Sequence, residues 1–273
     1  MIDTAARSET EAAEAAAIRT EVDGPLLWIR IDRAAKRNAL TSAMYGKLAA
    51  VLDEADRTAS VRTVVITGFN GTEHDMFSSG NDLADFLANP PKDESSNTVQ
   101  FLKALARFSK PLVAAVSGPA VGIGMTLLLH CDMVFAADNA RFQMPFTSLG
   151  VVPEAGSTQL LARSVGHVKA SELLLLGEPF SAEQALAWGL INAVASATEV
   201  EELARSRALK LAAQPAAALR ATKALIRSSR NADLDTVIVN EMKIFAQRLT
   251  SPEAQEAVSA FLQKRKPDFT QFD

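Results

Sequence analysis

One carboxylate stands alone in a stretch of small and apolar side chains. Glu154 is the only ionisable residue between Arg141 and Arg163, within the run Pro153-Glu-Ala-Gly-Ser157. A carboxyl group among apolar neighbours tends to have a raised pKa, which suits a general base. The same residue could instead cap a helix that begins at Ser157 or face solvent, so the pattern alone leaves these interpretations open.

A glycine-punctuated turn precedes this carboxylate along the chain. It reads Ser117-Gly-Pro-Ala-Val-Gly-Ile-Gly124 and follows the apolar run 112–116. Gly122 and Gly124 allow a sharp turn and the close approach of another group. A helix that begins there would offer unpaired amide hydrogens to an anion. The turn lacks the glycine spacing of nucleotide-binding loops, so a nucleotide site is not favoured.

A second loop, Phe77-Ser-Ser-Gly-Asn-Asp-Leu83, follows another apolar strand pattern and by itself could be only a turn. Two loops that each follow a core strand can each aim one backbone amide at a shared point. Such an oxyanion hole contributes about 2.7–4 kcal/mol per donor in other enzymes. Together with the carboxylate of Glu154, these amides form the plan of a catalytic site.

Other clusters of polar residues favour simpler interpretations. His130-Cys131-Asp132 are adjacent on an expected helix, where neighbours point about 100° apart, so a helix end is favoured over a metal site. No metal ligands are expected elsewhere. Lys264-Arg265-Lys266 at the last helix end is typical of a solvated cluster that complements the helix dipole, or could hold a phosphorylated ligand.

The elements that position these residues alternate between strand and helix and then become helical. The expected strands or extended segments are 26–31, 62–68, 112–116, 133–136 and 141–144. The expected helices are 42–56, 99–108, 123–130, 157–164, 168–176, 181–187, 199–212, 216–228, 233–249 and 252–264. This order predicts an α/β fold with a parallel core and a helical C-terminal region. We expect a flexible or loosely helical arm over 1–20, a core over 21–200 and a helical region over 201–273.

Composition narrows the class of protein. The net charge of −4 and the pI of about 5.5 argue against nucleic acid or an anionic membrane as the partner. The single cysteine, Cys131, excludes an internal disulfide and fits a reducing compartment. No apolar run approaches the roughly 18 residues of a membrane span, and no targeting signal is evident, so we expect a cytoplasmic protein.

Taken together, these motifs resemble those of the crotonase, or enoyl-CoA hydratase/isomerase, superfamily. The segments that carry the resemblance extend over residues 22–270 and keep the order expected for the family. They are 37–40, 77–83, 114–124, Asp132, 150–156, Gly166, 185–191 and 264–269.

The resemblance implies a spiral of ββα repeats with a helical trimerisation region, an acyl-CoA substrate and an enolate held by two backbone amides. Those amides map to Ser79 and Ile123. No metal or other cofactor is implied, because CoA is part of the substrate. The implied partners are an acyl-CoA and further copies of the chain, as a homotrimer or a dimer of trimers. Implied CoA-binding residues are Arg37, Ser78, Gly80, Asn81, Asp82, Leu83, Gly122, Gly124 and Lys264.

Departures from the family pattern bear on the reaction. Hydratases of the family carry two catalytic glutamates, and this chain has Thr126 and Phe146 at the matching positions. Peroxisomal-type Δ3,Δ2-enoyl-CoA isomerases and their bacterial relatives place one glutamate in a context that resembles Pro145 to Glu154. We therefore expect a Δ3,Δ2-enoyl-CoA isomerase with Glu154 as its base. The alternatives are an enoyl-CoA hydratase or other crotonase reaction, and a non-catalytic acyl-CoA-binding or scaffold protein.

Overall fold

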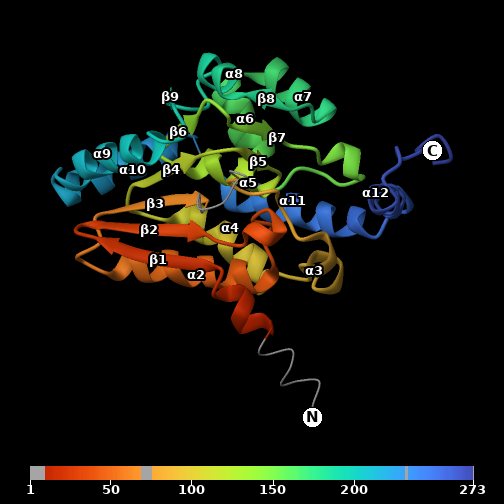
Figure 1. Ribbon diagram of the computed structural model, residues 1–273, viewed down its shortest axis with the longest axis horizontal. Coiled ribbons are helices and arrows are strands. Elements are labelled where there is room, and N and C mark those ends of the chain that lie inside the picture. The colour runs from red at the N-terminus through yellow and green to blue at the C-terminus, as the bar shows by residue number, and fades with distance from the viewer. Residues whose placement is uncertain (1–9, 69–75, 231–232, 273) are drawn as a thin grey trace, which may run out of the picture.

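A mixed sheet forms the centre of the fold in the computed structural model, which describes residues 10–68, 76–230 and 233–272 (Figure 1). Its strand order is β1-β2-β3-β4-β6-β9. β1 is antiparallel to β2, and the other neighbouring pairs are parallel. These strands are β1 (Ile18–Asp23), β2 (Leu26–Ile31), β3 (Thr63–Gly68), β4 (Leu112–Val116), β6 (Met133–Ala137) and β9 (Ala193–Ala195).

The apolar residues of β4 divide between the two faces of this sheet because successive side chains point to opposite sides. Val113 and Ala115 pack in a cluster with the small residues of α9 (Val200–Ala212). Leu112, Ala114 and Val116 belong to the larger core on the other face. Burial on both faces explains why this strand is a continuous apolar run.

A smaller sheet lies beyond the end of β4. It consists of β5 (Pro119–Val121), β7 (Arg141–Gln143) and β8 (Phe180–Ser181), in the order β5-β7-β8. β5 pairs in parallel with β7, and β7 pairs antiparallel with β8. Because β5 follows β4 after only two residues, the chain turns from the central sheet into the smaller one at the glycine-rich segment.

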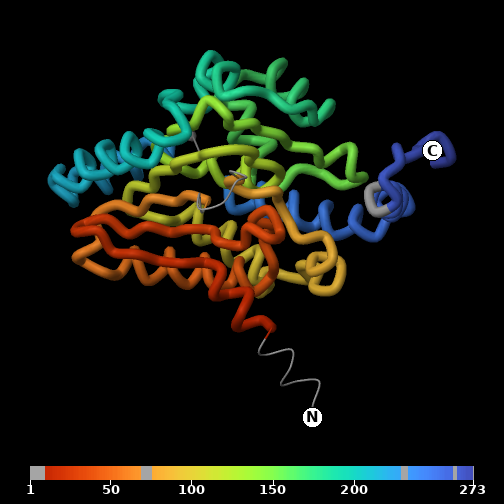
Figure 2. The backbone as a smooth tube through the Cα atoms, viewed as in Figure 1, coloured from red at the N-terminus to blue at the C-terminus, as the bar shows by residue number. Residues whose placement is uncertain are grey.

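Helices surround the two sheets. In Figures 1 and 2, α2 lies beneath the β1–β2 ribbon, α9 and α10 extend to the left, and the segment after α12 projects at the right. The remaining helices are α2 (Ser42–Arg57), α3 (Leu83–Ala88), α4 (Asn97–Arg107), α5 (Ile123–Thr126), α6 (Ser157–Val165), α7 (His167–Leu176), α8 (Ala182–Ala187), α10 (Ala216–Arg230), α11 (Leu234–Leu249) and α12 (Pro252–Leu262). Short 3-10 turns are η1 (Ala34–Lys36), η2 (Leu127–His130) and η3 (Thr147–Leu149).

The expected α/β order is present, but α3 and β5 were not expected, and three further details differ. β1 begins at Ile18, so residues 18–20 belong to the sheet, while 10–15 are helical and 1–9 lie outside the described residues. The helix expected over 123–130 is α5 followed by η2, since helix ends often tighten to 3-10 geometry. The region after Ser157 is not wholly helical, because β8 and β9 lie within it.

The helices of the described ranges include none that is both long and apolar enough to cross a bilayer.

Candidate functional site

The two loops singled out in the sequence lie against each other. Ser78 forms a parallel bridge with Ala120, and the amide of Val121 donates to the carbonyl of Ser78 at 2.8 Å. The loop after β3 is therefore hydrogen-bonded to β5, immediately before the turn at Gly122. This contact places Ser79 beside the segment that carries Ile123.

Gly124 is where this approach is closest. A Cβ atom on Gly124 would lie 2.9 Å from both the Cβ and the carbonyl oxygen of Ser78. Side chains larger than hydrogen would therefore push the two loops apart. Gly122 has φ +56°, in the region that favours glycine, and its turn directs the chain into α5.

The two candidate oxyanion amides differ in their present partners. Ile123 is the first residue of α5, and its amide has no acceptor among the described residues. The amide of Ser79 donates to the carbonyl of Arg37 at 3.0 Å. Arg37 and the next residue, Asn38, both have positive φ, at 52° and 54°. The Ser79 amide can serve a ligand only if this bond to Arg37 is shared or exchanged.

Glu154 lies next to the same short helix. Its side chain is 3% exposed, and its Oε1 accepts a hydrogen bond of 2.5 Å from the hydroxyl of Thr126. Thr126 is three residues after Ile123 on α5, so one helical turn separates the carboxyl group from the unpaired amide. The structure thus brings together the two features on which the sequence prediction rested.

Burial controls the acidity of Glu154. Loss of contact with water raises the pKa of Glu154 to about 8, the hydroxyl of Thr126 opposes this rise, and the charge of Glu241 adds to it. The simpler interpretations of Glu154 do not hold, because its carboxyl group is buried and makes no hydrogen bond to the start of α6.

A buried tyrosine lies beneath the second loop. The hydroxyl of Tyr45, on α2, donates to Oδ1 of Asn81. Burial raises the pKa of Tyr45 well above its usual range, and the charges of Glu154 and Asp85 raise it further. Tyr45 is therefore a neutral donor that fixes the orientation of the Asn81 amide.

The residues expected to bind CoA differ in how far other parts of the protein already engage them. Ser78 and Asp82 are engaged within the protein: the Ser78 hydroxyl donates to the carbonyl of Asn38 at 2.9 Å, and Asp82 caps α3 and pairs with Arg33 at 2.7 Å. Leu83 is half-buried at the start of α3, and Gly80, Gly122 and Gly124 supply backbone to the two apposed loops. Arg37 is exposed at the edge of the two loops, and Lys264 is exposed in the segment after α12.

The cluster His130-Cys131-Asp132 does not converge on a metal. Nε2 of His130 lies 2.7 Å from the carbonyl oxygen of Ala155, Cys131 Sγ contacts the carbonyl of Leu127, and Asp132 pairs with Lys223. Within the described ranges no group of three or more potential ligands could hold a metal ion.

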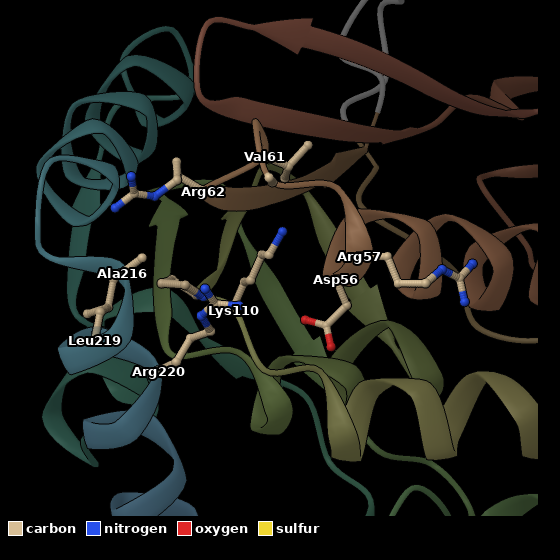
Figure 3. Close-up of a pocket in the computed structure, with 10 residues that line it drawn as sticks. Asp56, Arg57, Val61, Arg62, Lys110, Ala216, Leu219 and Arg220 are labelled. Carbon is tan, nitrogen blue, oxygen red and sulfur yellow. The ribbon is translucent and has the colours of Figure 1, made fainter.

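A separate cavity of about 200 Å³ lies at the amino ends of β3 and β4, the opposite end of these strands from the two loops (Figure 3). Arg62 and Lys110 reach it from the strand starts, and Arg220 reaches it from α10. Lys110 is committed to structure, because its ammonium group donates to the carbonyls of Ala55 and Thr58 at the end of α2. Its lining residues include neither Glu154 nor any residue of the two loops, so the cavity is separate from the candidate site.

Sequence reasoning missed two residues that contact the Glu154 loop. Glu241 accepts from the amides of Gly156 and Thr158, at 2.6 and 3.0 Å, and His130 contacts Ala155. The signal for Glu241 was present in α11, where it lies on the otherwise apolar face of buried residues. That face comprises Leu234, Ile238, Glu241, Met242, Phe245 and Leu249.

Comparisons with known proteins found similarity along most of the chain. The family model described as enoyl-CoA hydratase/isomerase matches residues 21–272. A 2,3-dehydroadipyl-CoA hydratase of Escherichia coli (strain K12) is 38% identical over 245 residues, which cover 89% of this chain and 94% of that protein. Enoyl-CoA delta isomerase 2 of Rattus norvegicus is 36% identical over 266 residues, or 95% of this chain and 66% of that protein. The solved structure of Pseudomonas aeruginosa OdaA has a TM-score of 0.86 at 49% identity, covering 90% of this chain and 98% of that one.

Proposed function

The chain belongs to the enoyl-CoA hydratase/isomerase family, and from this membership we propose that it is a Δ3,Δ2-enoyl-CoA isomerase. Its mixed α/β architecture with a helical C-terminal region is the crotonase fold of its structural neighbours. The proposed substrate is a 3-enoyl-CoA thioester, and the product is the trans-2-enoyl-CoA. CoA is part of the substrate, and no metal or redox cofactor enters the proposal.

The observation that carries the proposal is the single buried carboxyl group beside α5. Glu154 accepts from Thr126 on the helix whose first amide, that of Ile123, lacks an acceptor among the described residues. The other carboxylate that influences it, Glu241, is occupied by donors of the Glu154 loop. Moving a double bond needs one base that later acts as an acid, whereas hydration needs help at two centres.

In the proposed reaction, the carboxylate of Glu154 removes a proton from C2 of the 3-enoyl thioester. The electron pair of the broken C–H bond enters a dienolate, whose negative charge gathers on the thioester oxygen. The carboxylic acid form of Glu154 then gives its proton to C4, the thioester carbonyl is restored, and a new double bond forms between C2 and C3. The carboxylate is regenerated, so one residue suffices and no co-reactant is consumed.

The amides of Ile123 and Ser79 are the proposed donors to the thioester oxygen. The Ile123 amide is available at the start of α5. The Ser79 amide becomes available when the thioester oxygen replaces the Arg37 carbonyl as its acceptor, or when the two oxygens share this amide. Once the thioester is bound, both donors are in place before the charge develops, so they stabilise it without further rearrangement. The close packing of Gly124 on Ser78 supports this proposal, because it limits how far the two loops can separate.

The remainder of CoA is assigned to the edge of the two loops. We propose contacts to Arg37, to backbone and side chains of the segment 78–83 (Ser78, Gly80, Asn81, Asp82 and Leu83), to the turn at Gly122 and Gly124, and to Lys264. Because Lys264 lies after α12, its contact to a phosphate would be made most readily within an oligomer, as a homotrimer or dimer of trimers. A cytoplasmic location is part of the proposal.

Two alternatives remain as competing predictions. Hydration of a 2-enoyl-CoA is supported by the similarity to the 2,3-dehydroadipyl-CoA hydratase of Escherichia coli, with Glu154 then activating water. A non-catalytic acyl-CoA-binding or scaffold protein would retain the fold without turnover. The raised pKa of Glu154 and its placement beside α5 favour a working base over an idle fold.

Two parallel assays separate these functions. The purified protein is incubated with trans-3-hexenoyl-CoA and, separately, with trans-2-hexenoyl-CoA, and the ultraviolet band of the conjugated 2-enoyl thioester is followed. With an isomerase, the band appears when the first substrate is added, and the band already present in the second substrate does not change. Loss of absorbance with the second substrate identifies a hydratase, and no change with either contradicts both activities for this chain length.

A further inference from the structure

The loop that carries Glu154 takes an unusual path before α6. Ala155 and Gly156 both have positive φ, at 62° and 70°. For a residue with a side chain, such as Ala155, the left-handed conformation costs about 1–2 kcal/mol. Contacts from elsewhere must therefore hold this turn, because the local sequence does not favour it.

The same turn prevents α6 from carrying its own cap. The N-cap residue is Gly156, which makes no side-chain hydrogen bond to the helix. A side chain at Gly156 would suffer from the positive φ, and its Cβ would overlap Cδ1 of the buried Leu234. Ser, Thr, Asp or Asn, the usual N-cap residues, are thus excluded where the chain bends after Glu154.

The missing cap comes from a helix far along the chain. Leu234, Ile238 and Glu241 follow one another along one face of α11. The first two lie against Gly156, and the third places its carboxylate at the start of α6. Glu241 Oε2 accepts from the Gly156 amide at 2.6 Å, and its Oε1 accepts from the amide and hydroxyl of Thr158.

A second contact holds the turn from the side of α5. Nε2 of His130, in η2, lies 2.7 Å from the carbonyl oxygen of Ala155. His130 and Glu241 are both 6% exposed, so both contacts are shielded from water. His130 thereby holds Ala155 through its carbonyl, and Glu241 holds Gly156 through its amide.

We propose that Glu241 is a positioning residue for Glu154, which fixes the turn at Ala155 and Gly156 by capping α6 from α11. This inference rests on the proposed function, in which Glu154 is the base. The carboxylate of Glu241 does not touch the reacting atoms and acts through the loop. Burial raises the pKa of Glu241, and the three donors from Gly156 and Thr158 oppose this rise. These hydrogen bonds favour the carboxylate form, which can accept from all three donors.

The test compares two changes at one position. Glu241→Ala removes every acceptor, and we expect kcat for trans-3-hexenoyl-CoA to fall by about 10- to 100-fold, because small misplacements of a catalytic group are costly. KM should change less than about threefold, since the CoA portion binds elsewhere. Glu241→Gln keeps one oxygen as an acceptor, for either the Gly156 amide or the Thr158 amide and hydroxyl, while its NH2 group faces the other backbone N–H. Its kcat should therefore lie between those of Glu241→Ala and the wild type.

A matched control lies on the same helix. Asp235→Asn alters another carboxylate of α11, which pairs at the surface with Arg107, and should leave kcat and KM unchanged. Hydrogen exchange of the backbone amides of Gly156 and Thr158, measured by mass spectrometry on the peptide around them, should accelerate in Glu241→Ala alone. If Glu241→Ala does not fold, Thr158→Val replaces it, with a kcat loss of a few-fold expected.

The outcomes separate this inference from the proposed function. Wild-type kcat in folded Glu241→Ala, or in Thr158→Val where that variant takes its place, overturns the positioning role. Equal losses in Glu241→Ala and Glu241→Gln also overturn it, because the retained acceptor would then be without effect. If Glu154→Gln itself keeps normal turnover, the proposed function fails and the role of Glu241 fails with it.

Discussion

Glu154 is a weak acid because the protein removes it from water. A carboxyl group that is 3% exposed, with its pKa raised to about 8 by burial, is mostly protonated at neutral pH. The hydroxyl of Thr126 donates to it and favours the charged form. The carboxylate form that the proposed reaction requires therefore accumulates as pH rises.

This acidity predicts a pH profile for the free enzyme. We expect kcat/KM for trans-3-hexenoyl-CoA to rise with pH through a midpoint near 8 and then level off, because only the carboxylate can accept the C2 proton. Initial rates in buffers of constant ionic strength measure the profile. A midpoint near 4.5, the ordinary value for glutamate, would contradict the assignment.

Thr126→Val provides the matched comparison for this profile. The valine has nearly the same shape as threonine but cannot donate to Glu154, so the carboxylate loses a stabilising hydrogen bond. The midpoint of kcat/KM should move to higher pH, and the loss at neutral pH should shrink as pH rises. An unchanged midpoint would show that this hydroxyl does not control the reacting group.

Glu154 has a second consequence, for stability. Its pKa is higher in the folded protein than the ordinary value of 4.5, so the folded state binds the proton more tightly. The free energy of unfolding should therefore fall as pH rises between 4.5 and about 8, by up to about 1.4 kcal/mol per pH unit. Denaturant titrations should show that Glu154→Gln lacks this decline; equal slopes in both proteins would contradict the assigned pKa.

Residue patterns in the sequence singled out Glu154 and the two glycine-containing loops as candidates, but not the residues that contact and position them. Glu154 stood out because its neighbours are uncharged over a long stretch. Glu241 lies 87 residues further along the chain, and its contact with the loop depends on how α11 packs. The engagement of the Ser79 amide by Arg37 likewise depends on a turn with positive φ at two non-glycine residues, which spacing does not reveal.

At the scale of elements, the site depends on the contact between the loop after β3 and the start of α5. Gly124 permits that contact because a hydrogen atom faces Ser78 where a methyl group would lie 2.9 Å away. Gly124 does not have positive φ, so the glycine is required for space and not for backbone freedom. Its replacement should therefore change the spacing of the two amides.

We expect Gly124→Ala to lower the free energy of unfolding by about 1–3 kcal/mol through overpacking and to reduce kcat/KM by about tenfold or more. Gly24→Ala is the control: it lies in the β1–β2 turn at φ +57° with no atom near its Cβ position. It should cost about 1–2 kcal/mol of stability and leave kcat/KM unchanged. Similar losses of activity in both variants would argue against a specific role for the loop contact.

The long elements were predictable and the short ones were not. β4 follows directly from a continuous apolar run, and α2 from a periodic apolar face over 42–56. β8 and β9 contain only two and three residues, too few to show an alternating pattern. β9 is also rich in alanine, which favours helix, and it becomes a strand only because it pairs with β6.

For the molecule as a whole, α10 fastens the C-terminal helices to the core. Nζ of Lys223 donates to Asp132 at 2.6 Å and to the carbonyl of Lys110. Arg227 donates to backbone carbonyls, among them that of Phe108. Lys223 is 7% exposed, and burial lowers its pKa to about 8. These contacts join α10 to the segments that precede β4 and β6.

Lys223→Met keeps the apolar stem and removes the ammonium group, which leaves Asp132 without its ion-pair partner. We expect the free energy of unfolding to fall by about 3 kcal/mol, the low end for a broken buried pair, because Asp132 is partly exposed. Lys210→Met, at an exposed position on α9, should change stability by less than about 0.5 kcal/mol. Urea titrations of both variants measure the difference, and equal midpoints would contradict the fastening role.

The most direct test of the central claim is the conversion of trans-3-hexenoyl-CoA by wild type and Glu154→Gln, followed by the ultraviolet band of the conjugated thioester. The wild type should produce the band, and Glu154→Gln should produce it about 10²- to 10⁴-fold more slowly while binding hexanoyl-CoA with wild-type affinity by calorimetry. Turnover in Glu154→Gln equal to that of the wild type would contradict the claim that this one carboxylate moves the proton.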